Sequence, residues 1–140
     1  MCKANVVREG TDVTLVACGI MLAEALNAAE VLARAGISAA VIDCFTIKPL
    51  DEECLAEWAE KTGAVVTAEN QTVIGGLGSM VASCLARKCP VPMEMVGVQD
   101  KFGEVGDIPY LQKKFGLTAL DIVAAARKTV ARKGLKRERS

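Results

Sequence analysis

The chain has 140 residues, a formal net charge of zero and 51% hydrophobic residues, which fits one domain with a substantial core. The most apolar span, residues 13–23, is interrupted by Thr14, Cys18 and Gly19 and is too short to cross a membrane. There is no histidine, which excludes Ser-His-Asp and Cys-His catalysis and leaves a carboxylate or a lysine as general base.

Two Val-rich runs open the chain, at residues 4–8 and 12–18. Only Glu9, Gly10 and Thr11 separate them, so we expect the two strands to pair as an antiparallel hairpin. Residues 1–10 contain no apolar signal segment, and the expected location is therefore cytoplasmic.

A strand–helix–strand unit follows. Gly19 opens a run with apolar residues at helical spacing, which Gly36 is placed to cap. Residues 37–44 form an apolar run typical of a strand buried on both faces. We expect a right-handed βαβ unit with parallel strands.

The second helix has clear end signals: Pro49 bars a helix before it, Asp51 is a good N-cap and Gly63 ends it. The acidic cluster Asp51, Glu52 and Glu53 resembles a metal or acid/base site, but stabilisation of the helix start by negative charge explains it better.

A polar, glycine-rich stretch follows the fourth predicted strand, residues 64–67. Ligands and partners of an open α/β sheet are met at the carboxyl ends of its strands. We therefore place here a candidate rim for a partner chain or a small polyhydroxylated or anionic ligand. It comprises Glu69, Asn70, Gln71, Gly75, Gly76, Gly78 and Ser79.

Two interpretations of this stretch are open. The glycines allow close backbone approach, and the N–H groups of the helix start at residues 77–79 lack internal partners and could cradle an anion. Alternatively, the glycines only let the helix pack tightly on the sheet.

Residues 92–98 are expected to form the fifth strand, with Met93 and Met95 filling the core. The loop 99–107 is either a turn around a buried Phe102 or an exposed contact loop, and a short helix is expected over residues 108–115.

The last helix should begin after Thr118 as its N-cap, and its expected apolar face comprises Ile122, Val123, Ala126 and Val130. We expect a domain of residues 1–132 followed by a basic, frayed tail, 133–140. This tail has no aromatic residues and no second basic patch beside it, so neither nucleic acid nor a membrane is an expected partner.

The six cysteines show no CxxC spacing, and Cys18, Cys44 and Cys84 lie within apolar runs. We expect all six to be free thiols that bind no metal, because no histidine is present to share the ligation.

Four stretches carry a resemblance to a known family: GTDVTLVACG (10–19), AAVIDCFTIKPLD (39–51), TGAVVTAENQTVIGGLGS (62–79) and GVQDKFGEVG (97–106). In them the chain resembles the C-terminal domain of transketolases, thiamine-diphosphate enzymes that move two-carbon ketol units, from about Val6 to Arg127. It is less closely similar to deoxyxylulose-phosphate synthase and to the decarboxylating component of 2-oxoacid dehydrogenases. The resemblance implies a three-layer α/β/α sandwich on a five-stranded mixed sheet with the first strand antiparallel.

The chain departs from the family in two respects. Gln71 stands where transketolases commonly have histidine, and glutamine cannot change its charge near neutral pH. The magnesium-diphosphate motif and the activating glutamate belong to two preceding domains of the family and are not in this sequence. The resemblance therefore implies that this chain has no catalytic, cofactor-binding or metal-binding residue of its own, and that thiamine diphosphate and Mg are held elsewhere in the holoenzyme.

The function implied is a C-terminal domain or subunit that serves assembly and the active-site rim, with the thiamine-binding domains or subunit as partner. Asp100, Phe102 and Glu104 join the candidate rim on this basis. A domain that normally packs against others leaves apolar surface exposed, so a homodimer or weak oligomer is expected. The alternatives are a free-standing anion-binding or ligand-binding module and a docking domain, as in the dehydrogenase relatives.

Overall fold

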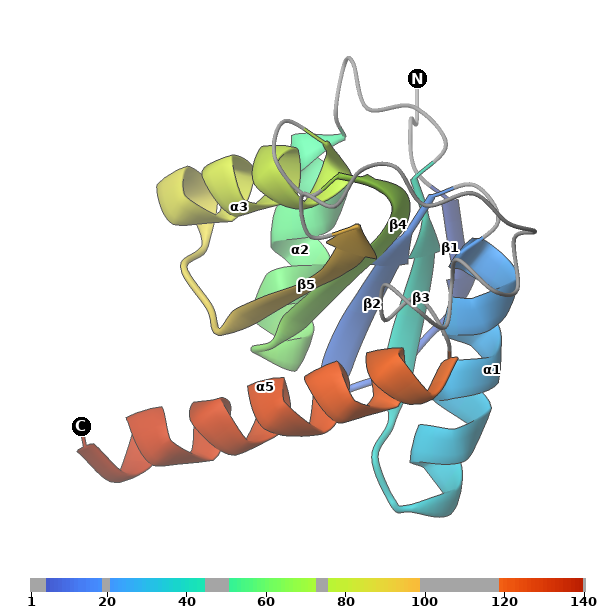
Figure 1. Ribbon diagram of the computed structural model, residues 1–140. Coiled ribbons are helices and arrows are strands. Elements are labelled where there is room, and N and C mark those ends of the chain that lie inside the picture. Colours follow the sequence, from blue (N-terminus) through green and yellow to red (C-terminus); the bar gives the residue numbers. More distant parts are fainter. Residues whose placement is uncertain (1–4, 19–20, 45–50, 73–75, 99–118, 140) are drawn as a thin grey trace.

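The computed structural model describes residues 5–18, 21–44, 51–72, 76–98 and 119–139. Its sheet has five strands in the order β1-β3-β2-β4-β5 (Figure 1). Pairing is parallel except between β1 and β3, as the resemblance implies. The strands are β1 (Asn5–Arg8), β2 (Val13–Ala17), β3 (Ala39–Asp43), β4 (Val65–Thr72) and β5 (Met93–Val98), and the helices are α1 (Met21–Arg34), α2 (Glu52–Thr62), α3 (Leu77–Lys88) and α5 (Ala119–Arg139).

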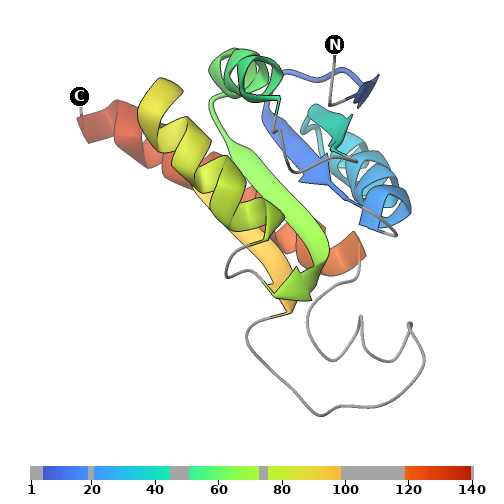
Figure 2. The same cartoon turned by 90° about the horizontal axis from the view of Figure 1, so that it is seen from above.

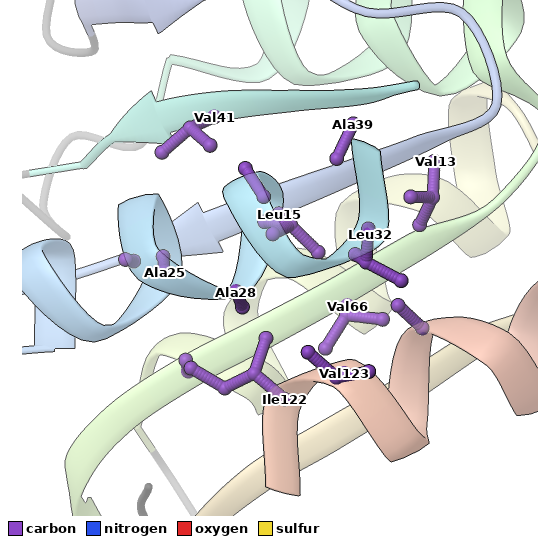
Figure 3. Packing of buried hydrophobic residues seen from close by; sticks show 14 of the residues in the cluster. Val13, Leu15, Ala25, Ala28, Leu32, Ala39, Val41, Val66, Ile122 and Val123 are labelled. Carbon is purple, nitrogen blue, oxygen red and sulfur yellow. The ribbon is translucent and has the colours of Figure 1, made fainter. Parts of the chain in front are cut away.

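Helices cover both faces of the sheet, so the three-layer sandwich is confirmed (Figures 1 and 2). Alternate strand residues face opposite layers because side chains on a strand point alternately up and down. Leu15, Val41 and Val66 pack against α1 and α5, as Figure 3 shows, together with Leu32 and Ile122 from these helices. On the other face, buried residues of β2, β3 and β4 pack against α2 and α3: Val16, Ala40, Ile42 and Val65 meet Leu55, Trp58, Leu77 and Val81.

The expected hairpin between the first two strands is wrong. β1 pairs with β3, and β3 lies between β1 and β2. The short connection therefore crosses the start of β3, and it does so in close contact: a Cβ atom on Gly10 would lie 2.3 Å from the carbonyl carbon of Ala39. Past the crossing, the N–H of Asp12 donates to the carbonyl of Ser38 at 2.8 Å, and the N–H of Ser38 donates to Asp12 Oδ2 at 2.7 Å.

The helix ends follow their local signals. α1 is followed by Gly36 with φ 81°. The side chain of Asp51 accepts the N–H of Cys54 at 3.2 Å, and α2 ends at Gly63 with φ 75°, in the left-handed region that glycine tolerates. β2, α1 and β3 form the expected strand–helix–strand unit with parallel strands.

Two expectations in the second half of the chain need correction. β4 extends to Thr72, beyond the predicted residue 67, because its pairing with β5 shifts register after Ala68 but continues to Thr72 and Val98. Met95 is 39% exposed and is therefore not core filling, whereas Met93 is partly buried.

At the C-terminus the predicted apolar face of α5 is confirmed, with Ile122 and Ala126 fully buried. The helix continues to Arg139, so residues 133–139 of the expected frayed tail are helical. Lys133 is anchored to the domain, since its Nζ donates to the carbonyls of Asp12 at 2.9 Å and Thr62 at 2.7 Å. Within the described ranges, no helix has both the length and the apolar character needed to span a membrane.

Candidate functional site

The candidate rim lies where β4 runs past its neighbour in the sheet. The pairing of β2 with β4 ends at Ala17 and Ala68, and β4 continues to Thr72. In Figure 2, β4 (green) reaches beyond the arrowhead of β2 (blue). Residues 69–71 were expected in a loop after the strand, but they lie within its last four residues, still at the carboxyl edge of the sheet.

Glu69 is the best-defined member of the candidate rim, and its carboxylate is bound inside the protein. The residue is 2% exposed. Its Oε2 accepts the N–H of Leu77 at 2.7 Å and its Oε1 accepts the N–H of Gly78 at 3.1 Å. Both donors belong to the first turn of α3, whose N-cap Gly76 has no side chain to accept them. Glu69 therefore caps α3 from the neighbouring strand.

This contact corrects one sequence-based expectation. The helix start was expected to have N–H groups without internal partners, but an internal carboxylate already binds those of Leu77 and Gly78. A negative charge at a helix N-terminus is favourable, and hydrogen bonds to a charged acceptor are stronger than neutral ones. The anion held at this helix start is thus a side chain of the protein itself.

The alternation of β4 explains why Glu69 reaches α3. Val65 packs against the α2 and α3 layer, and the side chains two and four residues later point to the same face. The extended strand therefore directs Glu69 toward α3. Sequence reasoning missed this role because it ended the strand at residue 67, although the same alternation carried four residues further would have indicated it.

Gly78 has a packing role. A Cβ atom there would lie 2.5 Å from Met95 Sδ and 3.1 Å from Thr67 Oγ1, closer than side chains normally approach. The absence of a side chain lets the first turn of α3 lie directly on β4 and β5. For this glycine, the alternative that glycine serves close packing is confirmed.

Two thiols lie near each other at the same edge of the sheet, and that of Cys18 lies near Glu69. The N–H of Cys18 donates to the carbonyl of Ala68 at 3.2 Å, and the N–H of Cys44 donates to that of Ala17 at 2.9 Å. Burial, and then the nearby carboxylate of Glu69, raise the pKa of the Cys18 thiol. Burial, and then Cys18, raise the pKa of Cys44 to about 12. Both side chains are therefore protonated near neutral pH and are poor nucleophiles.

The other residues of the candidate rim lie on β4, at the start of α3, or outside the described residues. Asn70 and Gln71 lie on β4 directly after Glu69, Gly76 precedes α3, and Ser79 is half-buried in its first turn. Gly75, Asp100, Phe102 and Glu104 lie outside the described residues. None of the five cysteines in the described ranges forms a disulfide, and no group of His, Cys, Asp or Glu in these ranges has the arrangement to hold a metal ion.

The acidic start of α2 has a structural partner. Oε2 of Glu52 accepts a hydrogen bond from Arg87 Nη2 of α3 at 2.6 Å. This hydrogen bond is the main reason that the pKa of Glu52 is lowered. This contact agrees with the expectation that the acidic cluster of Asp51, Glu52 and Glu53 stabilises the structure and is not a metal or acid/base site.

The structure also contains a pocket that the sequence did not indicate. It has a volume of about 280 Å³ and lies between α3, β5 and α5, with a mainly apolar lining: Ala82, Leu85, Ala86, Pro90, Val91, Met93 and Arg132. Nη1 of Arg132 donates to the carbonyl of Met93 at 2.9 Å and to Glu94 Oε2 at 2.8 Å.

Comparison with known proteins places this architecture among transketolases. Residues 2–122 match the family model described as "Transketolase, C-terminal domain". The chain is 59% identical over 134 residues to the 6-deoxy-6-sulfo-D-fructose transketolase subunit SqwH of Clostridium sp. (strain MSTE9). The aligned region covers 96% of this chain and 42% of the relative. The chain is 41% identical over 126 residues to the 1-deoxy-D-xylulose-5-phosphate synthase of Desulforudis audaxviator (strain MP104C), covering 89% of this chain and 20% of the relative.

A solved structure gives the same result. The structure titled "Split gene transketolase, inactive beta4 tetramer" superposes with a TM-score of 0.88 at 52% identity, over 91% of this chain and 42% of the other. The present chain thus spans less than half the length of these similar proteins.

Proposed function

Because the chain belongs to the transketolase C-terminal domain family, we propose that it works as the C-terminal part of an enzyme whose thiamine-binding domains lie elsewhere. Those domains would be on another subunit or in a preceding part of the same protein. The observation that carries this proposal is the 59% identity, over 96% of this chain, with a protein named as a transketolase subunit. The reaction proposed for the assembly is the transfer of a two-carbon ketol unit between sugars.

The start of α3 does not fit the diphosphate of thiamine diphosphate. A diphosphate would be expected at a helix N-terminus, but at the start of α3 the Glu69 carboxylate already binds the N–H groups of Leu77 and Gly78. A second anion there would meet this negative charge at close range. The proposed role of this chain is therefore assembly and formation of the active-site rim.

Titration calorimetry of the isolated chain with thiamine diphosphate and Mg²⁺ tests whether the cofactor is bound by other domains and not by this chain. We expect no saturable heat and no ketol-transfer activity. A micromolar binding signal would show that the chain carries a cofactor site of its own.

The rim role is tested with two substitutions. In an enzyme reconstituted with the thiamine-binding chain, we expect Gln71→Ala to weaken association or activity without lowering the melting temperature. Gly76→Val is the packing control, because Gly76 is buried at the start of α3, and it should destabilise the chain by about 1–3 kcal/mol. A silent Gln71→Ala with full turnover would leave this stretch as scaffold only.

For the substrate we propose a ketose donor with an anionic group, either a sugar phosphate or a sulfonated sugar. The sulfonated class is included because the SqwH relative is named for 6-deoxy-6-sulfo-D-fructose. Assays of the reconstituted enzyme with fructose 6-phosphate and with 6-deoxy-6-sulfofructose, at matched acceptor concentration, would distinguish the two. Turnover of neither donor would contradict the proposal.

Self-association is proposed for the chain without its partner. The similar solved structure is titled a β4 tetramer and is called inactive, which supports this expectation. Light scattering should show a dimer or larger species at high concentration, and a strict monomer would argue against it. A docking module remains the second candidate function, and a cytoplasmic location remains a prediction.

A further inference from the structure

We propose that Glu69 is a positioning residue whose buried carboxylate holds the N-terminus of α3 against the carboxyl end of β4. It thereby fixes the part of the candidate rim that both elements carry. The first part of this inference stands on the geometry of the chain alone. The second part rests on the proposed function, because it assumes that the candidate rim meets the thiamine-binding partner.

The Glu69 side chain links the end of β4 to the start of α3 by two hydrogen bonds. Eight and nine residues separate Glu69 from its two donors, and each carboxylate oxygen accepts one of them. With both oxygens bound and the residue 2% exposed, the side chain is restricted to a single orientation. The Glu69 side chain therefore holds the start of α3 at hydrogen-bond distance from β4.

Only a carboxylate serves both donors. Glutamine has the same shape, but its amide offers one acceptor oxygen and turns an NH₂ donor toward the second N–H. Aspartate is one methylene shorter. Because Leu77 and Gly78 are both buried, their N–H groups have no access to water as a replacement partner.

The other end of α3 is held differently. Arg87 in its last turn binds Glu52 of α2 at 2.6 Å, and both side chains are partly exposed. The exposed pair ties helix to helix, whereas Glu69 ties helix to sheet, at the end where Asn70 and Gln71 follow on β4. Beyond Ala68 this strand has lost β2 as a neighbour. Loss of the Glu69 contact should therefore affect the candidate rim more than the rest of the domain.

The first experiment measures amide hydrogen exchange by NMR in the full chain with Glu69→Gln, Glu69→Ala and the control Glu60→Gln, which changes an exposed carboxylate of α2. We expect the Leu77 and Gly78 amides to exchange at least about tenfold faster in both Glu69 variants and to be unchanged in the control. Unchanged exchange in Glu69→Gln would overturn the inference. This isosteric variant keeps the test valid if Glu69→Ala does not fold.

Formate provides a chemical rescue. It is a free carboxylate small enough for the space left by Glu69→Ala, so it should restore the protection of both amides and raise the melting temperature. Sodium chloride at equal ionic strength is the control. Rescue by formate alone supports a carboxylate cap, and equal effects of the two salts would contradict it.

The second experiment measures the affinity of the same variants for the thiamine-binding chain, well below their melting temperatures. We expect Glu69→Gln to raise the Kd about tenfold while Glu60→Gln does not, and formate to restore the affinity of Glu69→Ala. Fast amide exchange combined with an unchanged Kd would overturn the positioning role. If the wild-type chain does not bind this partner, the proposed function and the second part of the inference both fail, while the exchange data still decide the first part.

Discussion

Gly10→Ala is the most direct test of how the first strand reaches its place in the sheet. A Cβ atom at this position would lie 2.3 Å from Ala39 C, 2.4 Å from Ala40 N and 2.6 Å from Ala39 O. Ordinary contacts begin at 3.4 Å, so the crossing chain must move by about 1 Å, and the obstacle is backbone that cannot rotate away.

The magnitude follows from the contacts at the crossing. Overpacking of this kind costs about 1–3 kcal/mol. A 1 Å shift also disturbs the Asp12 to Ser38 hydrogen bonds at 2.8 and 2.7 Å, which are worth about 1 kcal/mol each. We therefore expect Gly10→Ala to lower the free energy of unfolding by about 3–5 kcal/mol and the melting temperature by roughly 10–17 °C.

Urea unfolding and thermal melting measure this change, and Gly36→Ala is the matched control. Gly36 has φ 81° but no atom within 4 Å of its Cβ position, so only backbone strain of about 1 kcal/mol is expected there. If Gly10→Ala destabilises the chain no more than Gly36→Ala, the steric argument for the crossing is refuted.

Three further predictions concern polar groups that are buried or partly buried. Lys133→Met removes two hydrogen bonds to carbonyls, at 2.9 and 2.7 Å, and should cost about 1.5–3 kcal/mol in urea unfolding, whereas the exposed Lys128→Met should change stability by less than about 0.5 kcal/mol. Glu24→Ala removes the acceptor of the Ala119 N–H at 2.8 Å and should cost about 1–2 kcal/mol, with faster amide exchange at the start of α5. The pKa of Cys44 is raised from 9.0 to about 12, chiefly by burial, so the folded chain keeps a proton that the unfolded chain releases. The stability that this thiol contributes is complete below pH 9 and is lost toward pH 12. Between pH 8 and pH 10.5 the free energy of unfolding should therefore decrease less for Cys44→Ala than for the wild-type chain.

The helix ends were predictable because their signals are local. Asp51 caps α2 from the adjacent position, and Gly63 ends it with positive φ. A cap or a left-handed glycine acts within a few residues, so the printed sequence contains both members of each interaction. The same holds for the burial of β3, which follows from a continuous apolar run.

The hairpin was wrong because the partner of a strand is not a local property. A three-residue connection fits a hairpin, but it also fits a crossing when another strand lies between the two. β3 occupies that place, and Ala39, the residue that the connection crosses at Gly10, comes 29 residues later in the sequence. The choice depends on which arrangement buries both faces of β3, and that is decided only when the layers assemble.

The sequence by itself determined the succession of strands and helices in the described residues and the limits of α2, because periodicity, caps and glycines act over short distances. The tertiary structure decided the order of the strands, the length of β4 and the role of Glu69. The N–H groups of Leu77 and Gly78 needed an acceptor that Gly76 could not supply, and the acceptor came from another element. Strand alternation can indicate the face on which Glu69 lies, but a hydrogen bond between elements forms only after both have packed, so its donors are identified in the folded chain.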